Sequence, residues 1–139
     1  MKRFLRLLCF VFAAGVLGGL VNSGVLYGLV HGGLLKAIGV KIAAPAGAAV
    51  WPWLYPRLIW GGIWGVLFLA PILKKTVLLR GLVLSIAPSA VQLLVIFPFK
   101  ANKGMLGLEL GVLTPVVVLV VNAVWGVAAD LFLRAVDEC

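Results

Sequence analysis

Charged residues are scarce in this sequence, and acidic ones are the scarcest. Only 12% of the 139 residues are charged, and four of these are Asp or Glu. A soluble globular domain carries about a quarter charged residues, which help to cover its surface. The chain is also 64% hydrophobic, so it has too few polar groups for a surface that faces water. We therefore expect an integral membrane protein, folded as a single domain over residues 1–139.

Metal-ligating and nucleophilic residues are equally few. His31 is the only histidine, and Cys9 and Cys139 are the only cysteines, so no metal-ligand spacing and no haem site with two histidines can form. No nucleophile stands beside a base, and no phosphate-binding loop or pair of deep carboxylates is present. Glu109 is the only acidic residue before Asp130. The sequence predicts no catalytic residue, no metal site and no cofactor, and we expect a protein that is not an enzyme.

Basic residues give the chain a net charge of +8, but they lie between long apolar runs. This placement is typical of topology signals and lipid-headgroup contacts, and it argues against nucleic acid as a partner. With both termini in the cytoplasm, that side carries seven basic residues and the other side five. The positive-inside rule therefore favours a cytoplasmic N-terminus and a cytoplasmic C-terminus.

Four apolar runs are long enough to cross a hydrocarbon core of about 30 Å. They predict an all-α protein with transmembrane helices at residues 4–30, 54–73, 76–99 and 106–133. The first run is too long for a cleaved signal peptide, so we expect an uncleaved signal-anchor helix. Pro88 is expected to kink the third helix, Pro98 to end it, and Pro115 to lie in the first half of the fourth. Residues 31–53 are expected to lie at the membrane interface or to re-enter the membrane.

Two stretches of the chain resemble each other. Gly19–Ser23 matches Gly81–Ser85 in four of five places, and Trp64-Gly65-Val66 matches Trp125-Gly126-Val127 completely. Each half is then a helical hairpin, the first over about residues 4–73 and the second over about 76–134. Such a duplication relates the hairpins by a pseudo-twofold axis along the membrane normal. Coincidence among abundant glycine, leucine and valine residues is the alternative.

Glycines recur at a spacing of four residues within the predicted helices. That spacing places them on one helix face, where two backbones can approach closely. The alternative is that these glycines have no special role in packing, because glycine is common in membrane helices. The expected packing positions are Gly15, Gly19, Gly24, Gly28, Gly61, Gly65 and Gly126.

Polar side chains inside the apolar runs are the candidate functional groups. Asn122 lies near the middle of its predicted helix, too deep to reach water, so its amide needs a partner within the protein. Ser85, Ser89 and Gln92 share one face of the third predicted helix, and Asn22 of the first helix is a natural partner. These five side chains either form hydrogen bonds between helices or line a narrow water path.

Four charged residues lie near the ends of the predicted helices. Arg57 and Glu109 are near the outer ends, and Arg80 and Asp130 are near the inner ends. Their matching depths predict two interhelical ion pairs, Arg57 with Glu109 and Arg80 with Asp130. The alternative is that each side chain reaches the interface separately.

The stretch Ala90-Val91-Gln92-Leu93-Leu94-Val95-Ile96-Phe97-Pro98 is followed by a glycine-rich helix. This arrangement resembles the corresponding stretch of YagU-type bacterial inner-membrane proteins, over about one helix. The resemblance implies a bacterial inner-membrane location and little about mechanism. The present chain lacks the longer extramembrane loop of those proteins.

Two functions fit these observations. Glycine-rich faces and the missing chemistry favour a non-catalytic membrane protein that acts through helix–helix assembly, as a homo-oligomer or as an accessory subunit of a larger membrane complex. Its partners would be membrane lipid and other membrane protein chains. The alternative is a small channel or transporter for an ion or small solute, formed at the interface between the repeats or between subunits.

Overall fold

A computed structural model describes residues 1–42, 44–70, 76–100, 102 and 104–137. Within these residues every regular element is helical, as the sequence predicts. Three helices are long and apolar enough to cross a membrane: Lys2–His31, Leu78–Lys100 and Thr114–Val136. The prediction of four such helices is therefore wrong by one.

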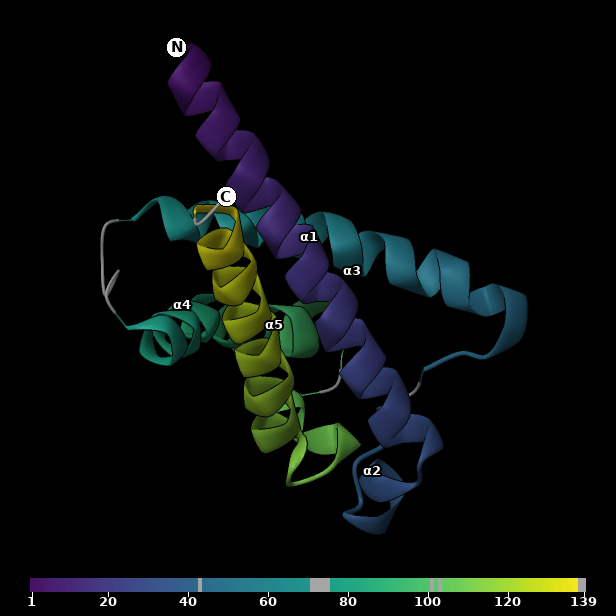
Figure 1. Ribbon diagram of the computed structural model, residues 1–139. Helices are drawn as coiled ribbons and strands as arrows, with labels where there is room; N and C mark the ends of the chain where they lie inside the picture. Colours follow the sequence, from purple (N-terminus) through teal and green to yellow (C-terminus); the bar gives the residue numbers. More distant parts are fainter. Residues whose placement is uncertain (43, 71–75, 101, 103, 138–139) are drawn as a thin grey trace.

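The long helix α1 (Lys2–His31) is the central element, and its bounds agree closely with the predicted 4–30. It packs against α3 (Val50–Trp64) on one side and against α5 (Thr114–Asp137) on the other. Helix α4 (Val77–Val91) packs against α5. The helices thus contact one another in the order α3, α1, α5, α4 (Figure 1).

Helix α3 corresponds to the second predicted transmembrane helix, and it is too short to cross a membrane. It begins at Val50, four residues earlier than expected, and after Trp64 it changes into the 3₁₀ helix η2 (Gly65–Leu69). Pro52 lies in the first turn of α3, where its missing N–H removes no intrahelical hydrogen bond. At 1.5 Å per residue, the 15 residues of α3 extend about 22 Å, which is short of a hydrocarbon core of about 30 Å. The predicted end near Leu73 lies outside the described residues.

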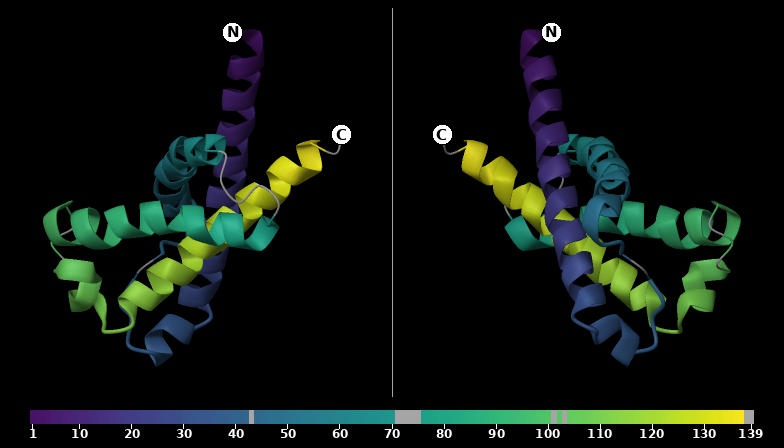
Figure 2. Two further views of the ribbon diagram at one scale, coloured as in Figure 1. Left: turned by 90° about the vertical axis from the view of Figure 1, so that its left-hand side faces the viewer. Right: turned by 90° about the vertical axis from the view of Figure 1, so that its right-hand side faces the viewer.

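Helix α4 continues directly into a π-helix, η3 (Gln92–Lys100). Together they cover the third predicted helix. Pro98 lies inside η3, so the expectation that it ends the helix is off by two residues. π-helices are rare and are frequent at functional sites, and Gln92 is the first residue of this one. Figure 2 shows that α4 and η3 cross α1 and α5 rather than run alongside them.

The fourth predicted helix begins later than expected. Residues Met105–Leu110 form a separate 3₁₀ helix, η4, and Gly107 within it has a φ of +69°. Gly111 follows with a φ of +147°, a conformation that only glycine adopts easily. Helix α5 therefore starts at Thr114, and Pro115 lies in its first turn, a favourable position for proline.

The segment between α1 and α3 contains two short helices, α2 (Leu34–Ala37) and η1 (Gly47–Ala49). Its Leu35 and Val40 are buried against the ends of α1 and α5. The backbone N–H of Lys41 donates to the carbonyl oxygen of Leu110 at 2.7 Å. The segment thus folds back onto the helices, and whether it lies at the interface or re-enters the membrane stays a prediction.

Two apolar clusters lie at successive levels of α1 and α5, and a smaller one of Leu93, Phe97 and Val118 lies between η3 and α5. The first contains Val11 and Ala14 of α1 with Trp125 and Ala129 of α5, together with Phe68 and Leu84. The second contains Leu26 of α1 with Val117 and Val121 of α5, together with Leu35 and Val40. We call them the Trp125 cluster and the Leu26 cluster. The residues between them on α1 and α5 include Asn22 and Asn122, so the core is interrupted by polar groups.

Close helix packing uses part of the predicted glycine set. A Cβ atom at Gly61 would lie 2.7 Å from the carbonyl oxygen of Gly15, and one at Gly19 would lie 3.0 Å from that of Arg57. A Cβ at Gly65 would collide with the backbone of Val11. These approaches allow α1 and α3 to touch backbone to backbone, as small residues do in membrane helices.

The remaining glycines divide into two groups. A Cβ at Gly126 would collide with the backbone of Gly81, which is not among the predicted packing positions. No atom of the described residues lies within 4 Å of such a Cβ at Gly24 or Gly28, so neither glycine packs closely against the described part of the chain. Nine residues separate Gly24 from Gly15, which at about 100° per residue places them on opposite faces of α1.

Candidate functional site

Six polar side chains meet between the Trp125 cluster and the Leu26 cluster, and we call them the polar layer. They come from α1, α3, α4, η3 and α5, so every long helix contributes. Four of them belong to the predicted polar set, and the other two come from the α1–α3 contact. The layer consists of Asn22, Ser23, Arg57, Ser89, Gln92 and Asn122.

Arg57 provides the charge of the polar layer. Its Nε donates to Ser23 Oγ at 2.8 Å, and its Nη2 donates to Asn22 Oδ1 at 2.6 Å. Its guanidinium carbon also lies 4.8 Å from the centre of the Trp53 ring, within the range of a cation–π contact. All these partners are uncharged. The guanidinium Nη1 donates to no residue in the described part of the chain.

Two asparagines connect α1 to α4 through α5. The Asn22 amide donates to the carbonyl oxygen of Val121 at 2.8 Å and to Asn122 Oδ1 at 3.3 Å. The Asn122 amide in turn donates to Ser89 Oγ at 3.0 Å and to Gln92 Oε1 at 3.3 Å. A continuous chain of hydrogen bonds therefore runs from Arg57 to Gln92. Each deep amide finds its partner inside the protein, as a membrane interior requires.

Ser85 is the predicted polar residue that stays outside this chain. Its hydroxyl donates to the carbonyl oxygen of Leu82 in the same helix, at 2.7 Å. The Ser89 hydroxyl also donates within α4, to the carbonyl oxygen of Ser85 at 2.9 Å, while it accepts from Asn122. Ser89 therefore links the helix backbone to the polar layer, whereas Ser85 does not.

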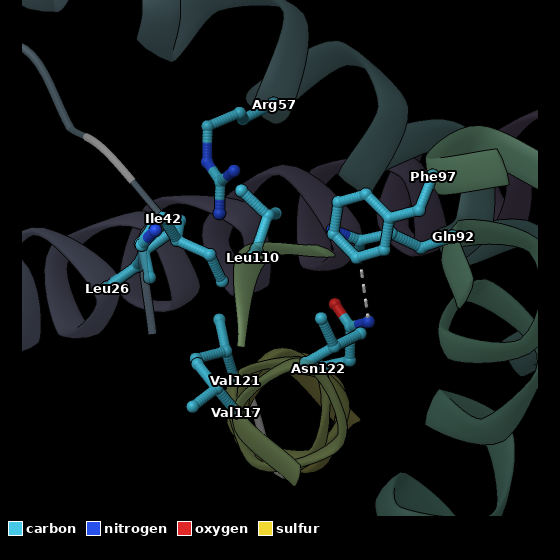
Figure 3. A pocket seen from close by; sticks show the side chains of 11 residues that line it. Leu26, Ile42, Arg57, Gln92, Phe97, Leu110, Val117, Val121 and Asn122 are labelled. Atoms are coloured by element: carbon cyan, nitrogen blue, oxygen red, sulfur yellow. Dashed lines mark hydrogen bonds between the residues drawn. The ribbon is translucent and has the colours of Figure 1, made fainter. Parts of the chain in front are cut away.

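Two cavities adjoin the polar layer. Cavity 1 has a volume of about 430 Å³ and cavity 2 of about 380 Å³, both within the range of small-molecule sites. Arg57, Gln92 and Asn122 line both of them. Figure 3 shows the guanidinium group of Arg57 pointing into cavity 1, across from Val117 and Val121 of α5. The two cavities thus meet at three polar side chains.

The rest of the lining is largely apolar, with basic residues added. Leu26, Ile42 and Phe97 contribute to cavity 1, and Trp60 and Trp64 contribute to cavity 2. The exposed Lys41 also lines cavity 1, and the exposed Lys100 lines cavity 2. Among the described residues, every charged side chain that lines either cavity is basic. The site therefore has a positive potential within apolar walls.

Trp125 closes cavity 2 toward the Trp125 cluster. Its indole Nε1 donates to the carbonyl oxygen of Gly15 at 3.1 Å, and its ring lies 5.9 Å from that of Phe68. A Cβ at Gly18 would lie 2.6 Å from the Trp125 carbonyl oxygen, so the backbones of α1 and α5 are in close contact here. Beyond this contact the core is packed.

A second charged group lies on the far side of Trp125. Arg80 Nη1 lies 3.3 Å from Asp130 Oδ1, and Arg80 Nη2 donates to the carbonyl oxygen of Phe68 at 2.6 Å. Arg134 Nε lies 3.8 Å from Asp130 Oδ2. Asp130 is fully buried. The structure therefore brings together the Arg80 and Asp130 that the sequence pairs, and it adds Arg134.

The other predicted ion pair, Arg57 with Glu109, is not formed. Glu109 is exposed on η4, while Arg57 binds Ser23 and Asn22. The prediction assumed one helix from Leu106 onward, which would have placed Glu109 near its end. The chain instead breaks at Gly111, so Glu109 does not share the axis of α5.

Sequence reasoning missed the depth of Arg57. A helix that begins at residue 54 places Arg57 in its first turn, whereas α3 begins at Val50 and places it about two turns inside. The signal that could have shown this is Pro52, because proline favours the first turn of a helix. Ser23 entered the sequence analysis only as part of the repeat match, and its bond to Arg57 follows from the corrected depth of Arg57.

The apolar helices indicate a multi-pass membrane protein, because three of them are long enough to cross a membrane. The polar layer lies between these helices. Comparison with protein-family models, with curated proteins and with solved structures finds no match. Within the described residues, no group of three His, Cys, Asp or Glu side chains could hold a metal ion.

Proposed function

We propose that this chain is a small transporter, which carries a solute through the polar layer of its own helices. The observation that supports this most strongly is that Arg57, Gln92 and Asn122 border two cavities at once. Polar groups inside membrane proteins commonly mark substrate pathways. A function in assembly alone would not need cavities beside the polar layer.

The two cavities follow each other along α1 and α5. Cavity 1 is lined by Leu26 of α1 and Val117 of α5, whereas cavity 2 is lined by Gly19 of α1 and Trp125 of α5. A solute that moves from one cavity to the other therefore passes the three shared polar side chains. Their amide and guanidinium groups can replace hydrogen bonds that the solute makes to water.

The packing around Trp125 supports a carrier rather than an open channel. Its hydrogen bond to Gly15 and the packed cluster beyond it close the far side of cavity 2. Passage then requires that α5 move relative to α1, as in alternating access. The crossing of α4 over α5 at Gly81 and Gly126 gives a close backbone contact about which such a movement can occur.

Flux into proteoliposomes tests this proposal. The solutes are erythritol, inorganic phosphate and choline, which represent the three charge classes and cross protein-free vesicles slowly. We expect at least one to enter faster than in protein-free vesicles, and Ser89→Leu with Asn122→Leu to abolish the difference. Ile86→Leu with Val120→Leu, at exposed positions on the same two helices, is the matched control. Flux that survives the Ser89 and Asn122 changes would rule out this path.

Assembly is the second candidate function. Gly24 and Gly28 lie four residues apart on a face of α1 that has open space around it, and such a face suits close packing with a second chain. Size exclusion in mild detergent tests this. We expect an oligomer or a co-purifying membrane protein, and a shift to monomer when both glycines are changed to leucine. A wild-type monomer without a partner would contradict it.

The duplication of a hairpin stays a prediction, and the contacts bear on it in two ways. Both halves pair their helices through glycine, at Gly61 in the first half and Gly126 in the second. In the repeat, Gly65 corresponds to Gly126 and Gly19 corresponds to Gly81. Gly126 contacts Gly81, but Gly65 contacts Val11, which lies eight residues before Gly19. If the hairpin was duplicated, the two helices of one copy are therefore shifted along each other by about two helical turns relative to the other copy. A bacterial inner-membrane location with both termini in the cytoplasm likewise stays a prediction.

A further inference from the structure

Within the described residues, the charge of Arg57 has no acidic partner. Its hydrogen bonds go to Ser23 and Asn22, and none of the described ion pairs includes it. Those ion pairs involve Asp130, which lies beyond the Trp125 cluster. Neutral dipoles lower the penalty for holding a cation in an apolar interior, but they leave its charge in place. A positive charge therefore remains beside the two cavities.

The guanidinium group has donors left for a ligand. A guanidinium carries five N–H donors in a planar fork, which matches the oxygens of a carboxylate or phosphate. Among the described residues, Arg57 donates one hydrogen bond from Nε and one from Nη2. The group points into cavity 1 (Figure 3), and the bonds to α1 hold it in that direction. The unused edge at Nη1 is thus positioned for an oxyanion.

The rest of each cavity favours the same kind of ligand. Lys41 and Lys100 add a positive charge to cavity 1 and cavity 2 respectively, which attracts anions and repels cations. The apolar walls, for example Phe97 in cavity 1 and Trp60 in cavity 2, give a hydrocarbon group a place to bind. A fully hydrated inorganic ion would leave these walls unused.

From these observations we infer that the solute is an amphiphilic oxyanion, with its charged group on Arg57 and its apolar part in the adjoining cavity. This inference deepens the proposed function and rests on it for the route by which the solute arrives. The oxyanion can belong to a water-soluble organic acid or to the headgroup of an anionic lipid. Both present the same chemistry to Arg57.

A binding experiment in nanodiscs of neutral phosphatidylcholine tests the inference with the full chain. The probes are octanesulfonate, dioctanoyl phosphatidic acid, inorganic phosphate and octyltrimethylammonium. Tryptophan fluorescence reports binding, because Trp53 contacts Arg57 and Trp60 lines cavity 2. We expect saturable binding of octanesulfonate or of the lipid, weaker binding of phosphate, and no saturable response to the cation. A response to octanesulfonate alone identifies a soluble acid, and a response to the lipid alone identifies a membrane ligand.

Variants of Arg57 decide whether that residue is responsible. Loss of a charge-assisted hydrogen bond predicts that Arg57→Gln weakens the apparent Kd by about tenfold or more, while Arg57→Lys keeps part of the affinity. Arg3→Gln, at the exposed start of α1, is the matched control and should bind as the wild type does. Circular dichroism and size exclusion show whether each variant is folded. If Arg57→Gln is not folded, the affinity of Arg57→Lys is compared with that of the wild type instead.

Three results would overturn the inference. They are wild-type affinity in folded Arg57→Gln, an affinity for octyltrimethylammonium equal to that for the tighter of the two amphiphilic anions, and an affinity for phosphate equal to that for the same anion. The experiment measures binding without flux, so its failure is distinct from failure of the proposed transport. If erythritol crosses the vesicles and neither octanesulfonate nor dioctanoyl phosphatidic acid binds, the proposed path is supported and the proposed anionic ligand is wrong. If octanesulfonate binds through Arg57 and no solute crosses, the site stands and transport is wrong.

Discussion

At the scale of single residues, Asn122 is the junction of the polar layer. It accepts a hydrogen bond from Asn22 and donates to Ser89 and Gln92. Its need for an internal partner could be predicted from the sequence, because lipid offers none. The role of Arg57 could not, since its depth depends on where α3 begins. Propensity and proline placement fix such a boundary only within a few residues.

Replacing Asn122 by alanine should destabilise the protein by about 1–2 kcal/mol, because three hydrogen bonds of about 0.6 kcal/mol each are lost. Unfolding in a sodium dodecyl sulfate titration measures this. Val120→Ala, an exposed position on the same helix, is the control and should change stability by less. Equal effects of the two changes would show that the polar layer contributes little to stability.

The buried Arg80 and Asp130 predict a non-additive pair. Asp130→Leu leaves Arg80 buried without its carboxylate and should cost about 3–5 kcal/mol, whereas adding Arg80→Met should recover part of that loss. A double-mutant cycle on unfolding free energies measures the coupling. Additive effects of the two changes would mean that the 3.3 Å contact contributes no net coupling.

At the scale of elements, hydrophobic runs predicted α1 and the joined α4 and η3 well, because long apolar segments in lipid have few alternatives to a helix. The starts of α3 and α5 were missed. In α5 the reason is the backbone of Gly107 and Gly111, which adopt positive φ inside an otherwise apolar run. Composition cannot distinguish such a glycine from one that packs between helices.

Glycine positions give a matched test of helix packing. Gly126→Ala should destabilise the protein by about 1–3 kcal/mol, because its Cβ would collide with the backbone of Gly81 and separate α4 from α5. Gly24→Ala has open space and should leave stability unchanged or raise it slightly, since alanine is the better helix former. The same detergent titration measures both. A larger loss of stability for Gly24→Ala than for Gly126→Ala would show that the packing face of α1 includes Gly24.

At the scale of the whole molecule, α1 and α5 are antiparallel neighbours. Asn22 bonds to the backbone of Val121, and Trp125 bonds to that of Gly15. In Figure 1 the Lys2 end of α1 and the last turn of α5 both lie toward the upper end of the view. The expectation that both termini lie in the cytoplasm stays a prediction, because it assumed four spans and the described residues contain three. The sequence could not predict that α4 and η3 cross α1 and α5, because crossing angles follow from side-chain packing.

This arrangement predicts that both termini lie on one side of the membrane. Protease accessibility of terminal tags in sealed proteoliposomes measures this. Tags on opposite sides would show that only the three apolar helices cross.

We propose that the polar layer joins two cavities into a path for a solute. The initial rate at which octanesulfonate, which keeps its charge at any pH near neutrality, enters sealed proteoliposomes tests this most directly. We expect uptake by the wild type and by the Ile86→Leu, Val120→Leu control, and the protein-free rate for the Ser89→Leu, Asn122→Leu variant. Uptake by that variant at the wild-type rate would show that the solute does not pass through the polar layer.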